Sequence, residues 1–234
     1  VITMLPDGPD SEAVILGDSG VLAGITKGAI IIDMSSIAPG ISQKIARSCE
    51  SSGAEFLDAP VSGGEPGAIE GTLAIMVGGK QGVFDNSQNI FESVGSSYVL
   101  CGDYGAGNTT KLANQIIVAT NIAAVGEALV LAKKAGLEPQ KVFDAIKGGL
   151  AGSNVLNAKG PMMISGNFNP GFRIKLHHKD IRNSMLTGSD LGVSLPVTSL
   201  VQQIIVSLVN EGKGELDHSA IANFVEKIND QSIS

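Results

Sequence analysis

The chain has few aromatic residues, no tryptophan and only two cysteines. Aromatic side chains make up 4% of the 234 residues, while glycine occurs 30 times. Many small aliphatic residues with much glycine favour an α/β protein with tight turns over an aromatic-rich β-sandwich. Cys49 and Cys101 form no CxxC pair and follow no recognisable signal peptide. We therefore expect both to be reduced, small buried side chains in an intracellular, cytoplasmic protein.

Basic residues and long uninterrupted apolar runs are also scarce. The 16 basic and 23 acidic residues give a net charge of −7, which argues against a general nucleic-acid binder. A few lysines in a cleft can still bind an anion in an acidic protein. The most apolar run, 116–132, contains Thr120, Asn121 and Glu127 and falls short of the ~18 apolar residues of a membrane span. We expect a buried core helix there, and no membrane segment.

The first hundred residues alternate between strand and helix patterns. A continuous apolar run such as 29–33 is typical of a strand that is buried on both faces. The pattern predicts strands at 1–5, 29–33, 55–59, 73–77 and 97–101, and helices at 10–16, 41–52 and 83–94. This alternation predicts an α/β fold with a Rossmann-type sheet that is parallel or mixed.

The pattern changes after residue 107, where strand signals disappear. One long helix is predicted at 108–135, about 42 Å in length at 1.5 Å per residue. Further helices are predicted at 139–147, 155–164, 179–191, 196–212 and 219–227. We therefore divide the chain into an α/β part, 1–106, and an all-helical part, 107–234, joined by the long helix.

The junction between these parts carries the clearest chemical motif, from Gly105 to Gln115. Two glycines permit a tight turn into the helix, and Lys111 lies in its first turns. Asn114 and Gln115 follow three and four residues later, on the same face as the lysine. A lysine and two amides at the start of a buried helix need polar partners, which an acid substrate would supply. The alternative is an ordinary surface lysine, although the helix dipole disfavours a cation there.

Three weaker motifs lie elsewhere. Asp58-Ala-Pro-Val-Ser62-Gly-Gly64 follows a predicted strand, at the sheet edge where ligands bind in open α/β folds, and its serine and glycine amides suit a carboxylate. In 170–180, His177 and His178 are adjacent, so they point to different faces, and no third ligand is spaced to join them. We therefore favour a helix with solvated charge over a metal site. Asp217-His218-Ser219 reads as a helix N-cap.

Taken together, these segments resemble the β-hydroxyacid dehydrogenase family along the whole chain. The segments that carry the resemblance are 2–6, 32–36, 58–64, 105–115, 148–153, 170–180 and 217–220. The resemblance implies a Rossmann domain and a helical domain in a homodimer or homotetramer. It also implies an NAD- or NADP-dependent oxidoreductase that acts on a small hydroxy acid.

The resemblance also implies a role for individual residues. Lys111 corresponds to the catalytic general acid/base. The substrate-binding residues are Ser62, Gly63, Gly64, Asn114 and Gln115, and the cofactor contacts are Leu5, Pro6, Ser36, Lys179 and Asp180. The family's amino-terminal strand and GxGxxG motif, which hold the cofactor pyrophosphate, have no counterpart here. We therefore expect the chain to be a fragment that lacks about 60 residues, including the one that selects NAD or NADP.

The sequence is compatible with three functions. Within the family the chain is most similar to members that reduce tartronate semialdehyde to D-glycerate, and Gln115 favours that substrate. Oxidation of 3-hydroxyisobutyrate, or of another β-hydroxy acid, is the nearest alternative. A non-catalytic dimeric scaffold of the same fold is the second alternative, against which the intact Lys111, Ser62, Asn114 and Lys179 argue.

Overall fold

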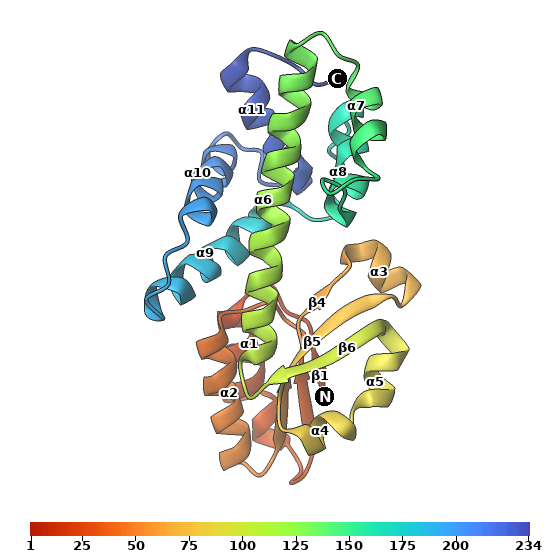
Figure 1. Cartoon of the computed structure of the whole chain (residues 1–234). Helices are drawn as coiled ribbons and strands as arrows, with labels where there is room; N and C mark the ends of the chain where they lie inside the picture. Colours follow the sequence, from red (N-terminus) through yellow and green to blue (C-terminus); the bar gives the residue numbers. More distant parts are fainter. The chain divides into compact units, whose positions relative to one another are not determined.

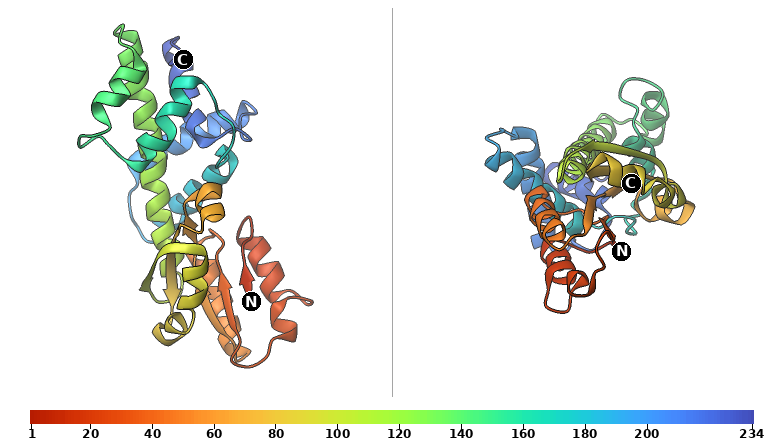
Figure 2. Two further views of the ribbon diagram at one scale, coloured as in Figure 1. Left: turned by 90° about the vertical axis from the view of Figure 1, so that its right-hand side faces the viewer. Right: turned by 90° about the horizontal axis from the view of Figure 1, so that it is seen from below.

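The structure, a computed structural model, describes residues 1–234 and divides into two compact units. The first unit comprises Val1–Asn114 and the second Gln115–Ser234. Figure 1 labels most of their helices and strands, and Figure 2 shows the same ribbon from two further sides. Because each unit is compact in itself, we describe them separately.

The first unit is built on one mixed six-stranded sheet. Its strands are β1 (Ile2–Thr3), β2 (Ile30–Asp33), β3 (Glu55–Asp58), β4 (Val61–Ser62), β5 (Leu73–Gly79) and β6 (Gly95–Gly102). Strands β1, β2 and β3 lie side by side and run parallel, whereas β5 is antiparallel to β3 and β4 and parallel to β6. The α/β fold class is thus confirmed, with a mixed sheet rather than a wholly parallel one.

Alternate side chains of the central strands enter two separate cores. Ile31 and Phe56 join one core with residues of α1 (Gly8–Leu16) and α2 (Pro39–Ser51). Ile32 and Leu57 join the other with residues of α4 (Gln81–Asp85) and α5 (Gln88–Val94). Helices therefore cover both faces of the sheet (Figure 1), as the apolar runs of β2 and β3 predicted.

Two local predictions for this unit were wrong. The helix predicted at 83–94 is broken into α4 and α5, because the hydroxyl of Ser87 donates to the Val83 carbonyl and competes with the helical backbone. The segment after β3, for which no helix or strand was predicted, contains β4 and the short helix α3 (Gly64–Glu70). Cys49 is buried, but Cys101 is exposed, so the prediction that both cysteines are buried was also wrong.

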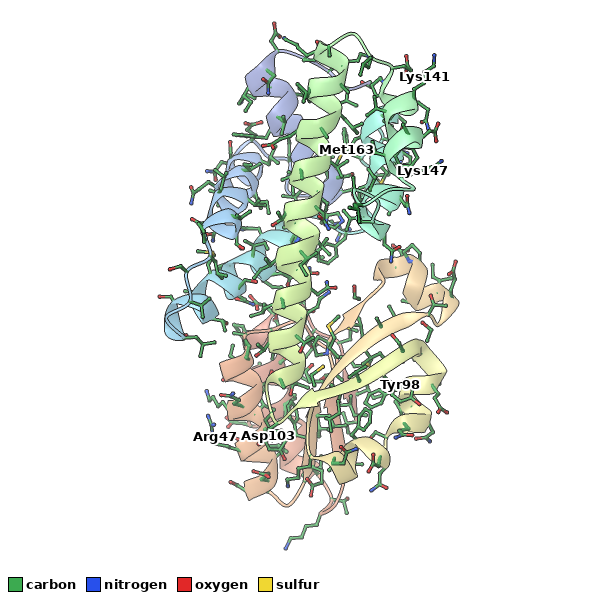
Figure 3. All side chains as sticks on the ribbon, in the orientation of Figure 1. Arg47, Tyr98, Asp103, Lys141, Lys147 and Met163 are labelled. Carbon is green, nitrogen blue, oxygen red and sulfur yellow. The ribbon has the colours of Figure 1, made fainter.

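The second unit consists of helices, as predicted. Helix α6 (Ala106–Lys134) begins in the first unit and continues into this one. The other elements are α7 (Pro139–Ile146), α8 (Asn154–Ser165), α9 (Ile174–Asp190), α10 (Pro196–Asn210), a 3₁₀ turn (His218–Ile221) and α11 (Ala222–Asn229). Their shared core includes Ile122 of α6, Met163 of α8 (labelled in Figure 3) and Ile205 of α10.

Only one face of α6 is buried, although its sequence predicted a helix buried nearly all round. Ala119, Ile122 and Leu129 lie in the core, whereas Ile117 and Leu131 are exposed by 61% and 72%. By length and composition alone α6 could cross a membrane. Its buried stripe, however, packs against the other helices of the unit, as the core helix of a helical bundle does.

Helix α9 begins five residues earlier than predicted. It starts at Ile174 and not at Lys179, because Ile174, His177 and Ile181 are buried at helical spacing. The polar residues between them had been interpreted as solvated charge. Lys179 therefore lies in the second turn of the helix. The N-cap predicted at Asp217 is confirmed, since its carboxylate accepts from the Ser219 amide at 2.9 Å.

Candidate active site

In the first unit, the predicted site residues follow the carboxyl ends of three parallel strands. Leu5 and Pro6 follow β1, Ser36 follows β2 and Ser62 follows β3. Because β1, β2 and β3 are neighbours and parallel, these segments lie along the same edge of the sheet. In doubly wound folds this edge is where ligands bind.

Hydrogen bonds connect the first two of these segments. The Leu5 amide donates to the Ser35 hydroxyl at 2.8 Å, and the Ser35 amide donates to Asp33 Oδ1 at 3.0 Å. The Thr3 hydroxyl donates to the same Asp33 oxygen at 2.9 Å. These bonds fix the backbone of Leu5 beside the end of β2. Sequence reasoning assigned no role to Thr3, Asp33 or Ser35, because only the strand pairing shows that they meet.

The start of helix α6 is anchored to the same edge by Asp58, the last residue of β3. Its carboxylate accepts hydrogen bonds from the backbone amides of Gly105 and Asn108, both at 2.8 Å. Burial raises the pKa of Asp58 to about 6, although these two hydrogen bonds oppose the effect. A carboxylate at a helix N-terminus also complements the helix dipole.

The side chain of Asn108 extends this anchor. Its Oδ1 accepts from the Ile37 amide at 2.9 Å, and its Nδ2 donates to the Ser42 hydroxyl at 3.0 Å. Asn108 is fully buried, so each of these polar groups needs its partner. The side chain therefore ties the loop after β2 and helix α2 to the start of α6.

Two glycines allow α6 to lie this close to the sheet. A Cβ on Gly107 would lie 2.4 Å from the Met76 carbonyl oxygen and 2.5 Å from that of Asp58. A Cβ on Gly78 would lie 2.5 Å from Asp58 Oδ1 and 2.7 Å from the Gly107 amide. Only hydrogen fits at either position, and the sequence had indicated only that the glycines before Lys111 turn the chain.

Lys111 lies in the second turn of this anchored helix. Its exposed fraction is 7%, so the alternative of an ordinary surface lysine was wrong. A buried lysine is uncommon unless it is paired or functional. Asn114, on the same face, is half-buried. The anchor at Asp58 and Asn108 thus fixes the position of the predicted proton-transfer residue within the first unit.

The predicted carboxylate-binding segment has a backbone that only glycine adopts readily. Gly63 has φ 137° and Gly64 has φ 63°, and both are exposed. Ser62, half-buried, ends β4, where it pairs with Ala74 of β5. Exposed glycine amides and a serine hydroxyl are the groups from which backbone anion-binding sites are built.

In the second unit, Gln115, Lys179 and Asp180 form one connected group. The Gln115 side-chain amide donates to Asp180 Oδ2 at 2.5 Å, and Lys179 forms an ion pair with Asp180 Oδ1 at 3.3 Å. Gln115 and Asp180 are buried, with exposed fractions of 4% and 2%. The structure therefore joins three of the predicted residues by direct contacts.

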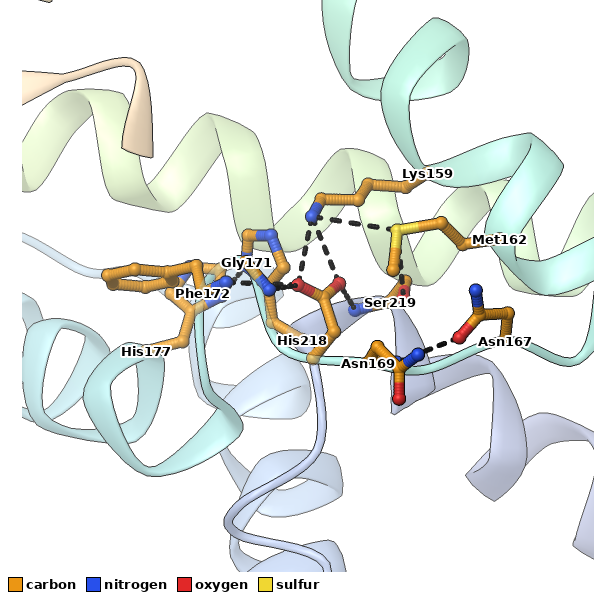
Figure 4. A network of polar contacts seen from close by, with 10 residues as sticks. Lys159, Met162, Asn167, Asn169, Gly171, Phe172, His177, His218 and Ser219 are labelled. Atoms are coloured by element: carbon orange, nitrogen blue, oxygen red, sulfur yellow. Dashed lines mark hydrogen bonds and ion pairs between the residues drawn. The ribbon is translucent and has the colours of Figure 1, made fainter. Parts of the chain in front are cut away.

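A second polar network of this unit centres on Asp217 (Figure 4). Its carboxylate accepts from the amides of Gly171, Phe172 and Ser219 and pairs with Lys159 at 3.0 Å. Burial by itself would raise the pKa of Asp217. The Phe172 and Ser219 amides, the charge of His218 and Lys159 instead lower it to about 2. Of this network, the sequence predicted only that Asp217 is an N-cap.

Two open depressions lie away from the predicted site residues. One, of about 650 Å³, is lined by Asp18, which follows α1, and by residues of α2 such as Lys44 and Arg47. The other, of about 570 Å³, is lined by residues near α11 such as Lys227 and Asp230. Neither is lined by a residue of the groups described above. The predicted site residues of each unit thus lie outside both depressions.

Comparisons with known proteins agree with this geometry. Residues 105–225 match the family model described as NAD-binding of NADP-dependent 3-hydroxyisobutyrate dehydrogenase. Residues 1–102 match the NAD binding domain of 6-phosphogluconate dehydrogenase. Among curated proteins, 2-hydroxy-3-oxopropionate reductase of Escherichia coli is 45% identical over 97% of this chain and 77% of its own length. 2-(Hydroxymethyl)glutarate dehydrogenase of Eubacterium barkeri is 37% identical over 100% and 78%.

Solved structures give the same result. 3-Hydroxyisobutyrate dehydrogenase of Mycobacterium tuberculosis, solved with L-serine, superposes with a TM-score of 0.87 at 33% identity, covering 96% of this chain and 78% of that one. The Salmonella typhimurium enzyme of the same name gives 0.86 at 26% identity, with 95% and 78% covered. The chain therefore belongs to the β-hydroxyacid dehydrogenase family, whose members are NAD(P)-dependent oxidoreductases.

Proposed function

We propose that this enzyme catalyses the reversible reduction of tartronate semialdehyde to D-glycerate, with Lys111 as the general acid and base. The observation that carries the chemistry is the buried Lys111 on a helix anchored by Asp58 at the ligand-binding edge of the sheet. The choice of substrate is supported by the 45% identical relative, whose name is 2-hydroxy-3-oxopropionate reductase. Gln115 beside Asn114 is the residue that favours this substrate.

The residues present fit a nicotinamide cofactor. Leu5, Pro6 and Ser36 follow the carboxyl ends of β1 and β2, and the Leu5 amide is held in place by Ser35. In the second unit, the Lys179–Asp180 pair is assigned to the same cofactor. NAD or NADP, when bound, supplies or accepts the hydride.

The chain's own residues bind the acid and move the proton. Ser62 and the amides of Gly63 and Gly64 bind the substrate carboxylate, which holds the carbonyl carbon in a fixed orientation. In the reducing direction, Lys111 as an ammonium group stabilises the negative charge that develops on the carbonyl oxygen and donates a proton to it. In the oxidising direction, neutral Lys111 takes the hydroxyl proton. Asn114 orients the lysine or the hydroxyl group.

3-Hydroxyisobutyrate is the second candidate substrate. It is supported by the family model that covers residues 105–225 and by 3-hydroxyisobutyrate dehydrogenase of mouse mitochondria, which is 32% identical over 97% of this chain. A dimeric scaffold without activity is the third candidate. The buried Lys111 and the glycine cradle argue against it, because a scaffold needs neither.

We assign 1–106 to a nucleotide-binding domain of Rossmann type and 107–234 to the helical domain of a homodimer or homotetramer in the cytoplasm. The exposed apolar residues of α6, Ile117 and Leu131, support an assembly, since monomers seldom expose such a face on a long helix. Light scattering on the purified protein measures the oligomer size. A single monomeric species would contradict this assignment.

The function is tested by the consumption of NADH and NADPH with three semialdehydes. We expect the fastest turnover with tartronate semialdehyde, and slower turnover with methylmalonate semialdehyde and succinate semialdehyde. Faster turnover with methylmalonate semialdehyde would favour 3-hydroxyisobutyrate as the natural product. A protein that assembles but consumes neither cofactor with any of the three would favour the scaffold.

A further inference from the structure

Two histidines that the proposed reaction does not use form a buried pair in the second unit. His177 of α9 and His218 of the 3₁₀ turn are exposed by 0% and 6%, and their Nδ1 atoms are 3.0 Å apart. The ring of Phe172 packs edge-on against both, with centroid distances of 5.8 Å and 5.2 Å (Figure 4). Because these rings are enclosed, their hydrogen bonds are not exchanged for water.

The geometry fixes which ring donates. His177 Nε2 lies 3.4 Å from the Gln115 carbonyl oxygen, which can only accept, so Nε2 carries a proton. A neutral His177 therefore presents Nδ1 as an acceptor, and His218 must donate from its own Nδ1. If both rings were protonated, two N–H groups would face each other. The pair can therefore take up one extra proton and keep its hydrogen bond, but not two.

Charged groups around the pair favour that single proton on His218. Asp217 is its chain neighbour, and its carboxylate is held ionised by three backbone amides and by Lys159 of α8. On α9, the charged groups near His177 are Lys179 and Asp180, which are paired with each other. α6 contributes the Gln115 carbonyl oxygen, and its charged residue nearest to Gln115 along the helix is Lys111, four residues earlier.

His177 binds the backbone of Gln115, and Asp180 binds the side chain of the same residue. His177 donates to the Gln115 carbonyl oxygen, and the Gln115 side chain donates to Asp180, three residues after His177 on the same face of α9. Lys179 lies between them and is bound to Asp180. The turn of α9 from His177 to Asp180 is thereby fixed against one residue of α6, and Lys179 lies within that turn.

We propose that His177 and His218 are positioning residues: as a proton-sharing pair, they hold α9 on Gln115 and so place Lys179 and Asp180 for the nicotinamide cofactor. This inference rests on the proposed cofactor role of Lys179 and Asp180. Among the proposed substrate residues the pair contacts Gln115, and it does so at the backbone carbonyl oxygen, not at the side chain. Its effect is therefore expected on cofactor affinity more than on the proton transfer.

The first test is independent of activity and uses ¹⁵N-histidine NMR of the purified enzyme. The chain has three histidines, so His178→Gln removes the one ring outside the pair and leaves two to observe. We expect His177 in the Nε2–H form, His218 donating from Nδ1, and uptake of one proton by the pair between about pH 8 and pH 5. Two rings that titrate independently, or a His177 protonated on Nδ1 in its neutral form, would overturn the proposal.

The second test compares two variants of similar size. His218→Asn keeps an N–H near the position of Nδ1, and His218→Leu removes it. We expect His218→Leu to weaken NADH and NADPH binding about three- to tenfold, the effect of one lost hydrogen bond, with little change in kcat. His218→Asn should retain wild-type affinity to within about twofold and lose the pH dependence of affinity that the pair causes.

The outcomes separate positioning from general stability and from the proposed function. Equal losses of affinity and of melting temperature in both variants would mean that His218 only fills space, and would overturn the proposal. If the wild type turned over no hydroxy acid yet bound cofactor with the expected variant effects, the inference would stand and the proposed substrate would fail. Unchanged cofactor affinity in His218→Leu would contradict the inference and leave the proposed function intact.

Discussion

The carboxylate of Asp58 caps helix α6 from another element, by accepting a 2.8 Å hydrogen bond from the Asn108 amide. A second bond of the same length from Gly105 completes the cap. Asp58 ends strand β3, and Lys111 lies three residues after Asn108. The cap therefore links the end of the sheet directly to the turn that carries the proposed general acid and base.

The first prediction concerns the pH dependence of this cap. Folding raises the pKa of Asp58 from 3.8 to about 6, so the native state holds that proton more tightly than the unfolded chain. The stability that this proton contributes is fully present below pH 3.8 and is lost as the pH rises through about 6. Relative to Asp58→Asn, the wild type should therefore lose up to about 3 kcal/mol of unfolding free energy across this window.

Urea unfolding of both proteins at a series of pH values measures this difference. Asp85→Asn, at an exposed carboxylate of α4, controls for the removal of a carboxyl group by itself. A difference between wild type and Asp58→Asn that stays constant with pH would contradict the prediction.

Much of the fold could be predicted because local pattern and tertiary packing agree. The apolar run at Ala29–Asp33 predicted the buried strand β2, and the glycines before Lys111 predicted the turn into α6. The start of α9 could not be predicted, because the partners of the buried His177 include His218, which lies 41 residues away. In the sequence alone, a buried polar residue whose partner lies far along the chain cannot be distinguished from a solvent-exposed one.

Contacts between residues far apart in the sequence also limit how much of the candidate site could be predicted. Lys111 and the Ser62–Gly64 segment could be chosen from the sequence, since their residue types suit the chemistry. Asp58 belonged to a recognised motif, but its role as the cap of α6 depends on the pairing of β3 beside β2 and on the close approach of Gly107. Both contacts join residues that are far apart in the sequence, so the local spacing of residues does not predict them.

The second prediction concerns the proposed proton transfer by Lys111. Lys111→Ala should lower kcat by about 10²- to 10⁴-fold and change the cofactor dissociation constant much less. Lys111→Arg keeps the charge but cannot release its proton, so its activity in the oxidising direction should stay low. Steady-state kinetics with the preferred semialdehyde, and fluorescence titration with NADH and NADPH, measure these effects.

Thr110→Ala is the control for substitution in this turn, because the Thr110 hydroxyl bonds to the Ala106 carbonyl of its own helix. Its turnover should remain within about threefold of the wild type, the effect of a minor change in the helix. Near-normal turnover in Lys111→Ala would instead remove the lysine from the mechanism.

The third prediction tests the close approach of α6 to the sheet. Gly107→Ala should destabilise the protein by about 1–3 kcal/mol, because its Cβ would lie 2.4 Å from a backbone oxygen and the helix start must move. For a chain of this size that corresponds to a fall in melting temperature of about 2–12 °C. Since Lys111 moves with the helix, kcat should fall as well.

Gly82→Ala is the matched control in α4, where a new Cβ meets no atom within 4 Å. It should leave kcat unchanged and raise stability by up to about 1 kcal/mol, because alanine loses less backbone freedom in a helix. If Gly107→Ala behaved like Gly82→Ala, the packing of α6 on the sheet would be looser than described.

The fourth prediction concerns the Asp217 network. Asp217→Ala leaves the half-buried Lys159 without its carboxylate and three backbone amides without their acceptor, so we expect a loss of about 3–5 kcal/mol. Lys159→Met should cost less, about 1–3 kcal/mol, because Asp217 keeps its amide donors. Chemical unfolding of the two single variants and the double variant measures the coupling between the two side chains.

The pH dependence of this network has the opposite sign to that of Asp58. Because folding lowers the pKa of Asp217 from 3.8 to about 2, its contribution to stability is present above pH 3.8 and is lost as the pH falls towards 2. The free-energy difference between wild type and Asp217→Ala should therefore shrink in acid, whereas the difference between wild type and Asp58→Asn should favour the wild type there. A shrinking difference for Asp58 in acid, or a growing one for Asp217, would show that the assignment of the two carboxylates is reversed.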